Sequence, residues 1–155
     1  MSQLPGEAEV RRLVAARELE QIRPDADLVE LLMDDAERHL ISAEQLAEDD
    51  PAGAFQMAYD ASRKACSALL AAQGLRATSR GGHIAVRDAA RAQFGHGSPG
   101  RVLREFDAMR RRRKDAEYPQ DPGDAIDAEE VRAVLPKSRA IVEYAVVLLP
   151  HLEPW

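Results

Sequence analysis

The densest group of side chains able to do chemistry is a run of five basic residues, Arg110 to Lys114. The apolar residues before the run repeat at helical spacing, so we expect the run to end a helix. The helix dipole favours one or two cations at that end but does not account for five. Successive helical residues advance by about 100°, so the run surrounds the axis and at least one arginine must point toward neighbouring helices.

A guanidinium that points inward needs a carboxylate, a phosphate or several carbonyls as its partner. Asp115 and Glu117 follow the run directly, and Glu143 is a third candidate carboxylate. In the structural interpretation, the run is a solvated face with one arginine paired inside the protein. In the functional interpretation, an arginine binds a phosphate and the phenol of Tyr118 donates a hydrogen bond to it.

A second group of polar residues comes earlier in the chain. Tyr59, Asp60 and Arg63 fall within one predicted helix, with Arg63 three or four residues after the other two. That spacing favours an internal salt bridge between Asp60 and Arg63. His83 follows two glycines at a predicted helix start, where a neutral imidazole either caps the helix or binds an anion.

Signatures of common enzyme classes are absent from the sequence, which contains no GxSxG, HExxH or P-loop pattern. Gly95, Gly97 and Gly100 form a cluster with no predicted strand before it, so we interpret it as a helix–helix loop. Cys66 is the single cysteine, which excludes an intrachain disulfide. A single cysteine and four scattered histidines also argue against a structural zinc site. We expect neither a metal nor a cofactor.

The charge is distributed unevenly along the 155 residues, although the net charge is only -6. Residues 1–50 hold 14 acidic and 5 basic residues, and residues 115–155 hold 9 acidic and 3 basic ones. Residues 51–114 hold 4 acidic and 13 basic residues. The acidic outer segments would repel a phosphate chain, so the sequence does not indicate a general nucleic-acid coat. It is compatible with one local anion-binding site.

The composition, 45% hydrophobic and 31% charged, is typical of one soluble globular domain. No run approaches the ~18–20 apolar residues that a membrane-spanning helix needs. The N-terminus carries Glu7 and Glu9 instead of the basic region and apolar core of a secretory signal. We therefore expect a cytoplasmic protein without membrane contact.

The spacing of apolar residues is helical almost throughout, without an alternating strand pattern, and predicts an all-α fold. We expect helices at about 27–47, 51–73, 83–93, 98–114 and 127–149. Together they predict an antiparallel bundle of four main helices plus a short one, the 83–93 helix. Residues 7–22 are helical by propensity but charged on several faces, which predicts a loosely docked N-terminal arm over residues 1–24. The bundle domain then covers residues 25–155.

Local signals define the expected helix ends. Asp50-Pro51 and Ser98-Pro99 each resemble a capping residue followed by proline in the first helical turn, and Asp127 with Glu130 resembles a capping box. Gly74 is placed to end the second long helix. Pro136, inside the last helix, predicts a kink or a restart.

Four segments together resemble the HEPN domains of bacteria and archaea (higher eukaryote and prokaryote nucleotide-binding). They are Ala58-Tyr-Asp-Ala-Ser-Arg-Lys-Ala65, Leu69-Leu-Ala-Ala-Gln-Gly-Leu75, Gly81-Gly-His83 and Arg113-Lys-Asp-Ala-Glu-Tyr-Pro119. The resemblance covers about residues 28–150. It implies a dimerising bundle of four or five helices. Active members of this family are metal-independent endoribonucleases, and many are toxins or defence effectors found beside a small nucleotidyltransferase antitoxin.

The family's motif is an arginine, usually followed by a polar residue, with a histidine about five residues after the arginine. One register places the arginine on Arg113, the polar residue on Lys114 and the histidine position on Tyr118. The other register places the arginine on Arg111 and the histidine position on Ala116. In both registers the histidine is missing, and a phenol with a pKa near 10 is a poor base at neutral pH, where an imidazole is a good one.

Two hypotheses follow from the resemblance. In the first, the protein is an RNA-directed toxin–antitoxin or defence component whose site forms across a homodimer. Arg113 and Tyr118 then act on the phosphate, while Arg110, Arg111, Arg112 and Lys114 hold the RNA backbone. The residues in supporting roles are Tyr59, Asp60, Arg63, His83, Asp115 and Glu117, and the family's helix packing suggests that Arg63 reaches the Arg113 corner. In the second, the chain is a non-catalytic interaction module, with an alanine-rich second helix and the last helix forming the dimer surface.

Overall fold

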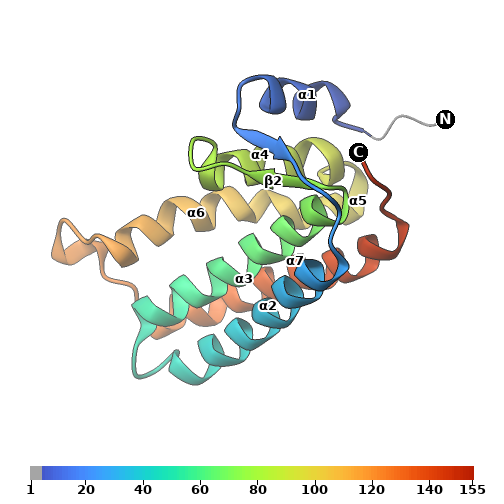
Figure 1. Ribbon diagram of the computed structural model, residues 1–155. Helices are drawn as coiled ribbons and strands as arrows, with labels where there is room; N and C mark the ends of the chain where they lie inside the picture. The colour runs from blue at the N-terminus through green and yellow to red at the C-terminus, as the bar shows by residue number, and fades with distance from the viewer. Residues whose placement is uncertain (1–4) are drawn as a thin grey trace.

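A computed structural model describes residues 5–155, and its regular structure is almost entirely helical (Figure 1). The longest helices are α2 (Ala26–Leu46), α3 (Pro51–Ala72), α6 (Arg104–Glu117) and α7 (Ala128–Leu148). The shorter elements are α1 (Glu7–Ala15), α4 (Gly82–Phe94), the single turn α5 (Gly97–Gly100) and three 3₁₀ turns at Arg101–Leu103, Pro122–Asp124 and Leu149–His151. The predicted all-α class is therefore confirmed.

Helix α3 lies at the centre of the molecule, with α2 and α7 beside it and α6 and α4 packed on it as well (Figure 1). Alanine and other small residues recur along α3 and are buried on several faces, which lets the neighbouring helices approach closely. The expectation that this alanine-rich helix forms a dimer surface is wrong, because its faces are already covered within one chain.

Most helix ends follow the predicted local signals. The Asp50 carboxylate accepts a hydrogen bond from the Gly53 amide at the start of α3, and Asp127 accepts one from the Glu130 amide at the start of α7. Helix α3 ends at Ala72, and Gly74, two residues later, has a left-handed φ of 77°; an added Cβ there would lie 2.7 Å from the Ile22 carbonyl oxygen. A residue without a Cβ is therefore needed at this position.

The expected break near residue 98 differs in detail. The chain becomes helical at Gly97 after an extended His96, so Ser98 lies inside the first turn and caps nothing. Helix α6 then begins at Arg104, because a 3₁₀ turn intervenes. Helix α7 runs through Pro136 without a restart.

The N-terminal segment departs most from expectation. Helix α1 stops at Ala15, Arg17 adopts a left-handed φ of 59°, and Leu19–Gln21 (β1) pairs antiparallel with Leu75–Ala77 (β2). The predicted helix over 7–22 is therefore too long, and residues 1–4 lie outside the described part of the chain. The segment is also firmly docked, because Val10 and Leu13 are fully buried.

One hydrophobic core joins residues of α1, β1, β2 and the long helices. Cys66 lies in this core as a free thiol with no exposed surface, and burial raises its pKa to about 12. In the part of the chain that the structure describes, no helix is long and apolar enough to cross a bilayer.

Candidate functional site

Tyr59 on α3 is the centre of the candidate site. Its ring is fully buried and stacks on Phe106 of α6 with a centroid distance of 5.6 Å and an interplanar angle of 11°. Its hydroxyl lies 2.8 Å from Nδ1 of His83, in the first turn of α4, and shares a hydrogen bond with it. The guanidinium carbon of Arg113, near the end of α6, lies 5.6 Å from the ring centroid. Three helices therefore meet at one phenol.

Two ion pairs flank this phenol. Arg63 donates from Nε to Asp60 Oδ1 at 3.0 Å, as the three-residue spacing predicted. Arg113 Nη2 lies 2.6 Å from a buried Glu117 oxygen, an ion pair outside hydrogen-bond geometry, and the predicted partnership is confirmed. We refer to the residues grouped here as the Tyr59 cluster: Tyr59, Asp60, Arg63, His83, Arg113 and Glu117.

The electrostatics of the cluster favour a neutral imidazole. Burial lowers the pKa of His83, and the positive charges of Arg63 and Arg113 lower it further, against the opposing effect of Asp60 and Glu117. Burial raises the pKa of Tyr59 to about 12, so its phenol stays protonated at neutral pH. At pH 7 the two side chains form a neutral hydrogen-bonded pair beside two guanidinium groups.

The other arginines of the basic run are held mainly by carboxylates. Arg110 and Arg111 both pair with Asp107, at 3.0 Å each, but Arg110 is only 12% exposed whereas Arg111 is 74% exposed. Hydrogen bonds from Arg87 above all, and from Arg110, lower the pKa of Asp107 to about 2. The prediction that some arginine points toward neighbouring helices is confirmed.

Arg112 connects α6 to the start of α7. It donates hydrogen bonds to Glu130 at 2.6 and 3.0 Å, to Asp115 at 3.0 Å and to the Ala125 carbonyl oxygen at 3.1 Å. The predicted role of Asp115 as a carboxylate partner is thus confirmed, with Arg112 as the arginine. Of the four cations predicted to hold RNA, Arg110, Arg111 and Arg112 each pair with a carboxylate of the protein, and Arg111 is the one of these three that is largely exposed.

Tyr118 and Lys114 lie on the surface at the end of α6. The Tyr118 side chain is 64% exposed, and its hydroxyl has no hydrogen-bond partner among residues 5–155. Lys114 is exposed as well, without an ion pair to any described carboxylate. The structure therefore brings Arg113 to Tyr59 and His83 and leaves Tyr118 outside that group.

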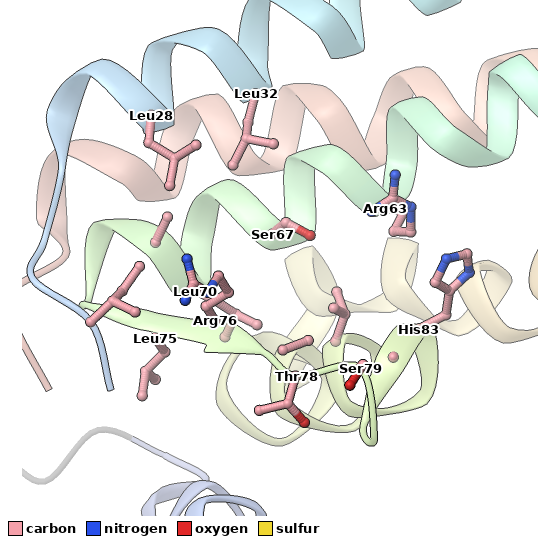
Figure 2. Close-up of a pocket in the computed structure, with 15 residues that line it drawn as sticks. Leu28, Leu32, Arg63, Ser67, Leu70, Leu75, Arg76, Thr78, Ser79 and His83 are labelled. Carbon is pink, nitrogen blue, oxygen red and sulfur yellow. The ribbon is translucent and has the colours of Figure 1, made fainter. Parts of the chain in front are cut away.

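A cavity of about 370 Å³ adjoins the Tyr59 cluster, and Arg63 and His83 contribute to its lining (Figure 2). Ser67 also lines the cavity, one turn after Arg63 on α3. Sequence reasoning missed Ser67, although its spacing of four from Arg63 was a usable signal. The lining residues from β2 could not be found in this way, because no strand was predicted between the helices at about 51–73 and 83–93. Among residues 5–155, no three histidine, cysteine or acidic side chains are grouped as metal ligands.

Comparison with known proteins identifies the fold. The family model described as the HEPN domain matches residues 29–148, which include α3, α4 and α6 and so the whole Tyr59 cluster. No curated protein and no solved structure matches the chain. Because the matched region covers most of the 155 residues, the chain belongs to the HEPN domain family.

Proposed function

We propose that this protein acts on single-stranded RNA as a metal-independent endoribonuclease. The observation that carries the proposal is the contact of His83 with Tyr59, whose ring also lies against Arg113. The motif position on α6 lacks a histidine, but α4 supplies an imidazole to the same corner. An imidazole can accept a proton and two guanidinium groups can stabilise phosphate charge, and transesterification of an RNA phosphate uses both of these contributions.

His83 is assigned the proton transfer. In the tautomer in which Nδ1–H donates to the Tyr59 oxygen, Nε2 keeps a free lone pair. Nε2 takes the proton of a ribose 2′-hydroxyl while that oxygen attacks the adjacent phosphorus. The bond from phosphorus to the 5′-oxygen breaks, and a proton from water or from the resulting imidazolium neutralises the leaving oxygen. The products are a 2′,3′-cyclic phosphate and a 5′-hydroxyl end.

Arg113 and Arg63 are assigned to binding the phosphate by donating hydrogen bonds to its oxygens. A guanidinium carries five N–H donors, so pairing with Glu117 or Asp60 leaves donors for phosphate oxygens. Arg111 and Lys114, which are exposed on the same helix as Arg113, are assigned to the RNA backbone. Tyr118 is assigned as a hydrogen-bond donor on the RNA side of the site.

The biological role that fits this activity is a toxin–antitoxin or defence component, with a nucleotidyltransferase-type antitoxin as a partner. We propose that the working form is a homodimer. Large apolar side chains are exposed on α2 (Leu31, Ile41) and on α7 (Val146, Val147), and exposed apolar area supports self-association. Light scattering at micromolar concentration should give about twice the chain mass of 17.1 kDa. A mass of one chain at every concentration would contradict the proposal that the working form is a homodimer.

One observation favours a second function, a non-catalytic interaction module. Arg63 and Arg113 each already have a carboxylate partner, as they would in a purely structural network. In that case Arg113 contributes to stability and has no ligand.

The variants Arg113→Ala and Arg111→Ala separate the two functions. We expect the wild type to cleave unstructured RNA in the presence of EDTA, and Arg113→Ala to lose about 10²–10³-fold in rate because a donor to the transition-state phosphate is gone. Arg113→Ala should cost about 1–2 kcal/mol in the free energy of unfolding, because the Arg113 and Glu117 side chains are 27% and 28% exposed although the paired Glu117 oxygen is itself buried. Arg111→Ala, on the same helix but 74% exposed, is the matched control and should change the rate only a few-fold.

The measurements are gel-resolved RNA cleavage, with identification of the cyclic phosphate end, and urea unfolding. A wild type that neither binds nor cleaves RNA, combined with a loss of about 3 kcal/mol or more in Arg113→Ala, would establish the interaction module instead.

A further inference from the structure

A polar recess lies between α1, α4 and the start of α6, apart from the cavity beside the Tyr59 cluster. Its volume is about 600 Å³. Arg91, in the last turn of α4, and Arg104, the first residue of α6, are the two cations that line it. Gly95 and Gly100, in the connection between these helices, form part of the lining as well. Two guanidinium-bearing side chains from different helices therefore share one space.

The recess has a net positive charge once the ion pairs around it are counted. Two carboxylates also line it, those of Glu9 and Asp88. Each is already paired, the first with Arg12 at 2.7 Å and the second with Arg87 at 2.8 Å. The two lining arginines, in contrast, are exposed and make no ion pair with any carboxylate between residues 5 and 155. An anion that enters the recess would meet two guanidinium groups whose N–H donors are free to bind it.

Helix stability does not account for the cations at the start of α6. The dipole of a helix favours anions over cations at this end. Arg101, in the 3₁₀ turn directly before α6, and Arg104 are nevertheless both exposed, and neither pairs with a described carboxylate. For Arg91 the dipole is a sufficient reason, because it lies at the end of its helix. A phosphate in the recess would place a negative charge where the dipole of α6 favours one.

The recess and the Tyr59 cluster lie at the two ends of one seam between α4 and α6, which pack against each other in opposite directions (Figure 1). At one end, His83 of α4 and Arg113 of α6 both contact Tyr59. In the middle, Arg87 of α4 donates a hydrogen bond to Asp107 of α6 at 2.7 Å. The recess forms the other end. A strand bound at the Tyr59 cluster can therefore follow the seam to the recess.

The length of the seam sets the number of nucleotides between the two sites. Arg104 precedes Arg113 by nine residues, which is about 14 Å along a helix that rises ~1.5 Å per residue. Phosphates of one stacked strand are spaced by about 3.4 Å, so this distance corresponds to about four nucleotides. We propose that the recess binds a phosphate of the RNA backbone about four nucleotides from the cleaved bond, with Arg91 and Arg104 as the donors.

The inference rests on the proposed function and adds a length requirement to it. A strand that reaches the recess gains two charge-assisted contacts that a shorter strand lacks, so the protein should prefer the longer one. The ligand chemistry is that of a phosphate group. Its source is either the backbone of RNA or free inorganic phosphate, and the experiment separates these sources.

The test compares two strands, each with one ribonucleotide in an otherwise 2′-deoxy chain, so that cleavage occurs at one known bond. The long strand extends about six nucleotides on each side of that bond, beyond the recess, and the short strand about two. Arg91→Gln/Arg104→Gln removes both cations and keeps side chains of good helix propensity. Its matched control is Arg38→Gln/Arg132→Gln, which removes two exposed arginines of α2 and α7 outside the lining. Thermal unfolding shows that each variant is folded.

Binding is measured by fluorescence anisotropy over a series of salt concentrations, beside single-turnover cleavage. We expect Arg91→Gln/Arg104→Gln to weaken binding of the long strand about tenfold and to lower its salt slope by about 1.4, because each phosphate contact of a single strand contributes about 0.7. Binding of the short strand and the cleavage rate at saturation should stay unchanged, because the Tyr59 cluster is intact. An equal loss in the control variant would show an effect of net charge and overturn the inference.

Calorimetry with inorganic phosphate completes the test. Phosphate binding that Arg91→Gln/Arg104→Gln abolishes, in a protein that neither binds nor cleaves RNA, supports an anion site for free phosphate and refutes the proposed function. RNA cleavage with the same strand-length preference and salt slope in this variant as in the wild type overturns the inference and leaves the proposed function intact. A wild type that binds neither RNA nor phosphate overturns both.

Discussion

Replacing His83 by asparagine is expected to reduce the rate of RNA cleavage by about 10²–10⁴-fold, the usual contribution of a general acid or base. Asparagine keeps a polar atom near the position of Nδ1, so the hydrogen bond to Tyr59 can be retained while proton transfer is lost. RNA binding should change only a few-fold, because the guanidinium groups of Arg63 and Arg113 remain. The measurement is single-turnover cleavage beside RNA binding and thermal unfolding.

The pH profile of the wild type gives an independent readout of His83. The pKa of His83 in the folded protein lies below its usual 6.5, so the neutral base predominates at pH 7 and the rate should fall only below about pH 6.5. That acidic limb should disappear in His83→Asn. His96→Asn is the matched control, because His96 is exposed and, among residues 5–155, its ring hydrogen-bonds to the Ala92 carbonyl oxygen alone. Full activity in His83→Asn would refute the assignment of proton transfer to His83.

Replacing Phe106 by alanine is expected to cost about 3–5 kcal/mol in the free energy of unfolding, as for other large-to-alanine changes in a core. Phe106 is fully buried and supports the Tyr59 ring by stacking. Because whole domains are stable by only about 5–15 kcal/mol, this is a large part of the total. Urea unfolding measures it, and the melting temperature should fall by roughly 10 °C.

Tyr118→Ala is the control for this aromatic deletion on the same helical segment. Its ring is 64% exposed, so the expected change is within about 0.5 kcal/mol. Equal losses in Phe106→Ala and Tyr118→Ala would show that the end of α6 packs differently, with Tyr118 buried by a partner or by a second copy.

The sequence was informative where one residue determines a local feature. Asp50 and Asp127 identified the starts of α3 and α7 because their carboxylates cap neighbouring amides, and Gly74 identified a helix end because the backbone there is left-handed. The strand β1 could not be found, because its partner is more than fifty residues away and three residues carry no periodicity. Arg17 before it has a left-handed backbone that local propensity does not favour.

The candidate site was predictable only in part for a related reason. The pairs Asp60–Arg63 and Arg113–Glu117 lie within single helices, so residue spacing was enough to find them. The hydrogen bond between Tyr59 and His83 joins two helices, and its existence depends on how α4 packs on α3. Tyr118, which occupies the histidine position in one register of the family motif, follows the last residue of α6, and where its ring points depends on where that helix ends.

The burial of Cys66 has a practical consequence for site-directed labelling. A thiol with no exposed surface and a pKa of about 12 has almost no thiolate at neutral pH, so maleimide reagents should leave it unmodified in the folded protein. Because Cys66 is the single cysteine, a cysteine introduced at an exposed position such as Ile84 would then be the one reactive thiol, without any need to alter the core. A fluorophore or spin label at position 84, in the first turn of α4, would report changes around His83 in an otherwise native chain.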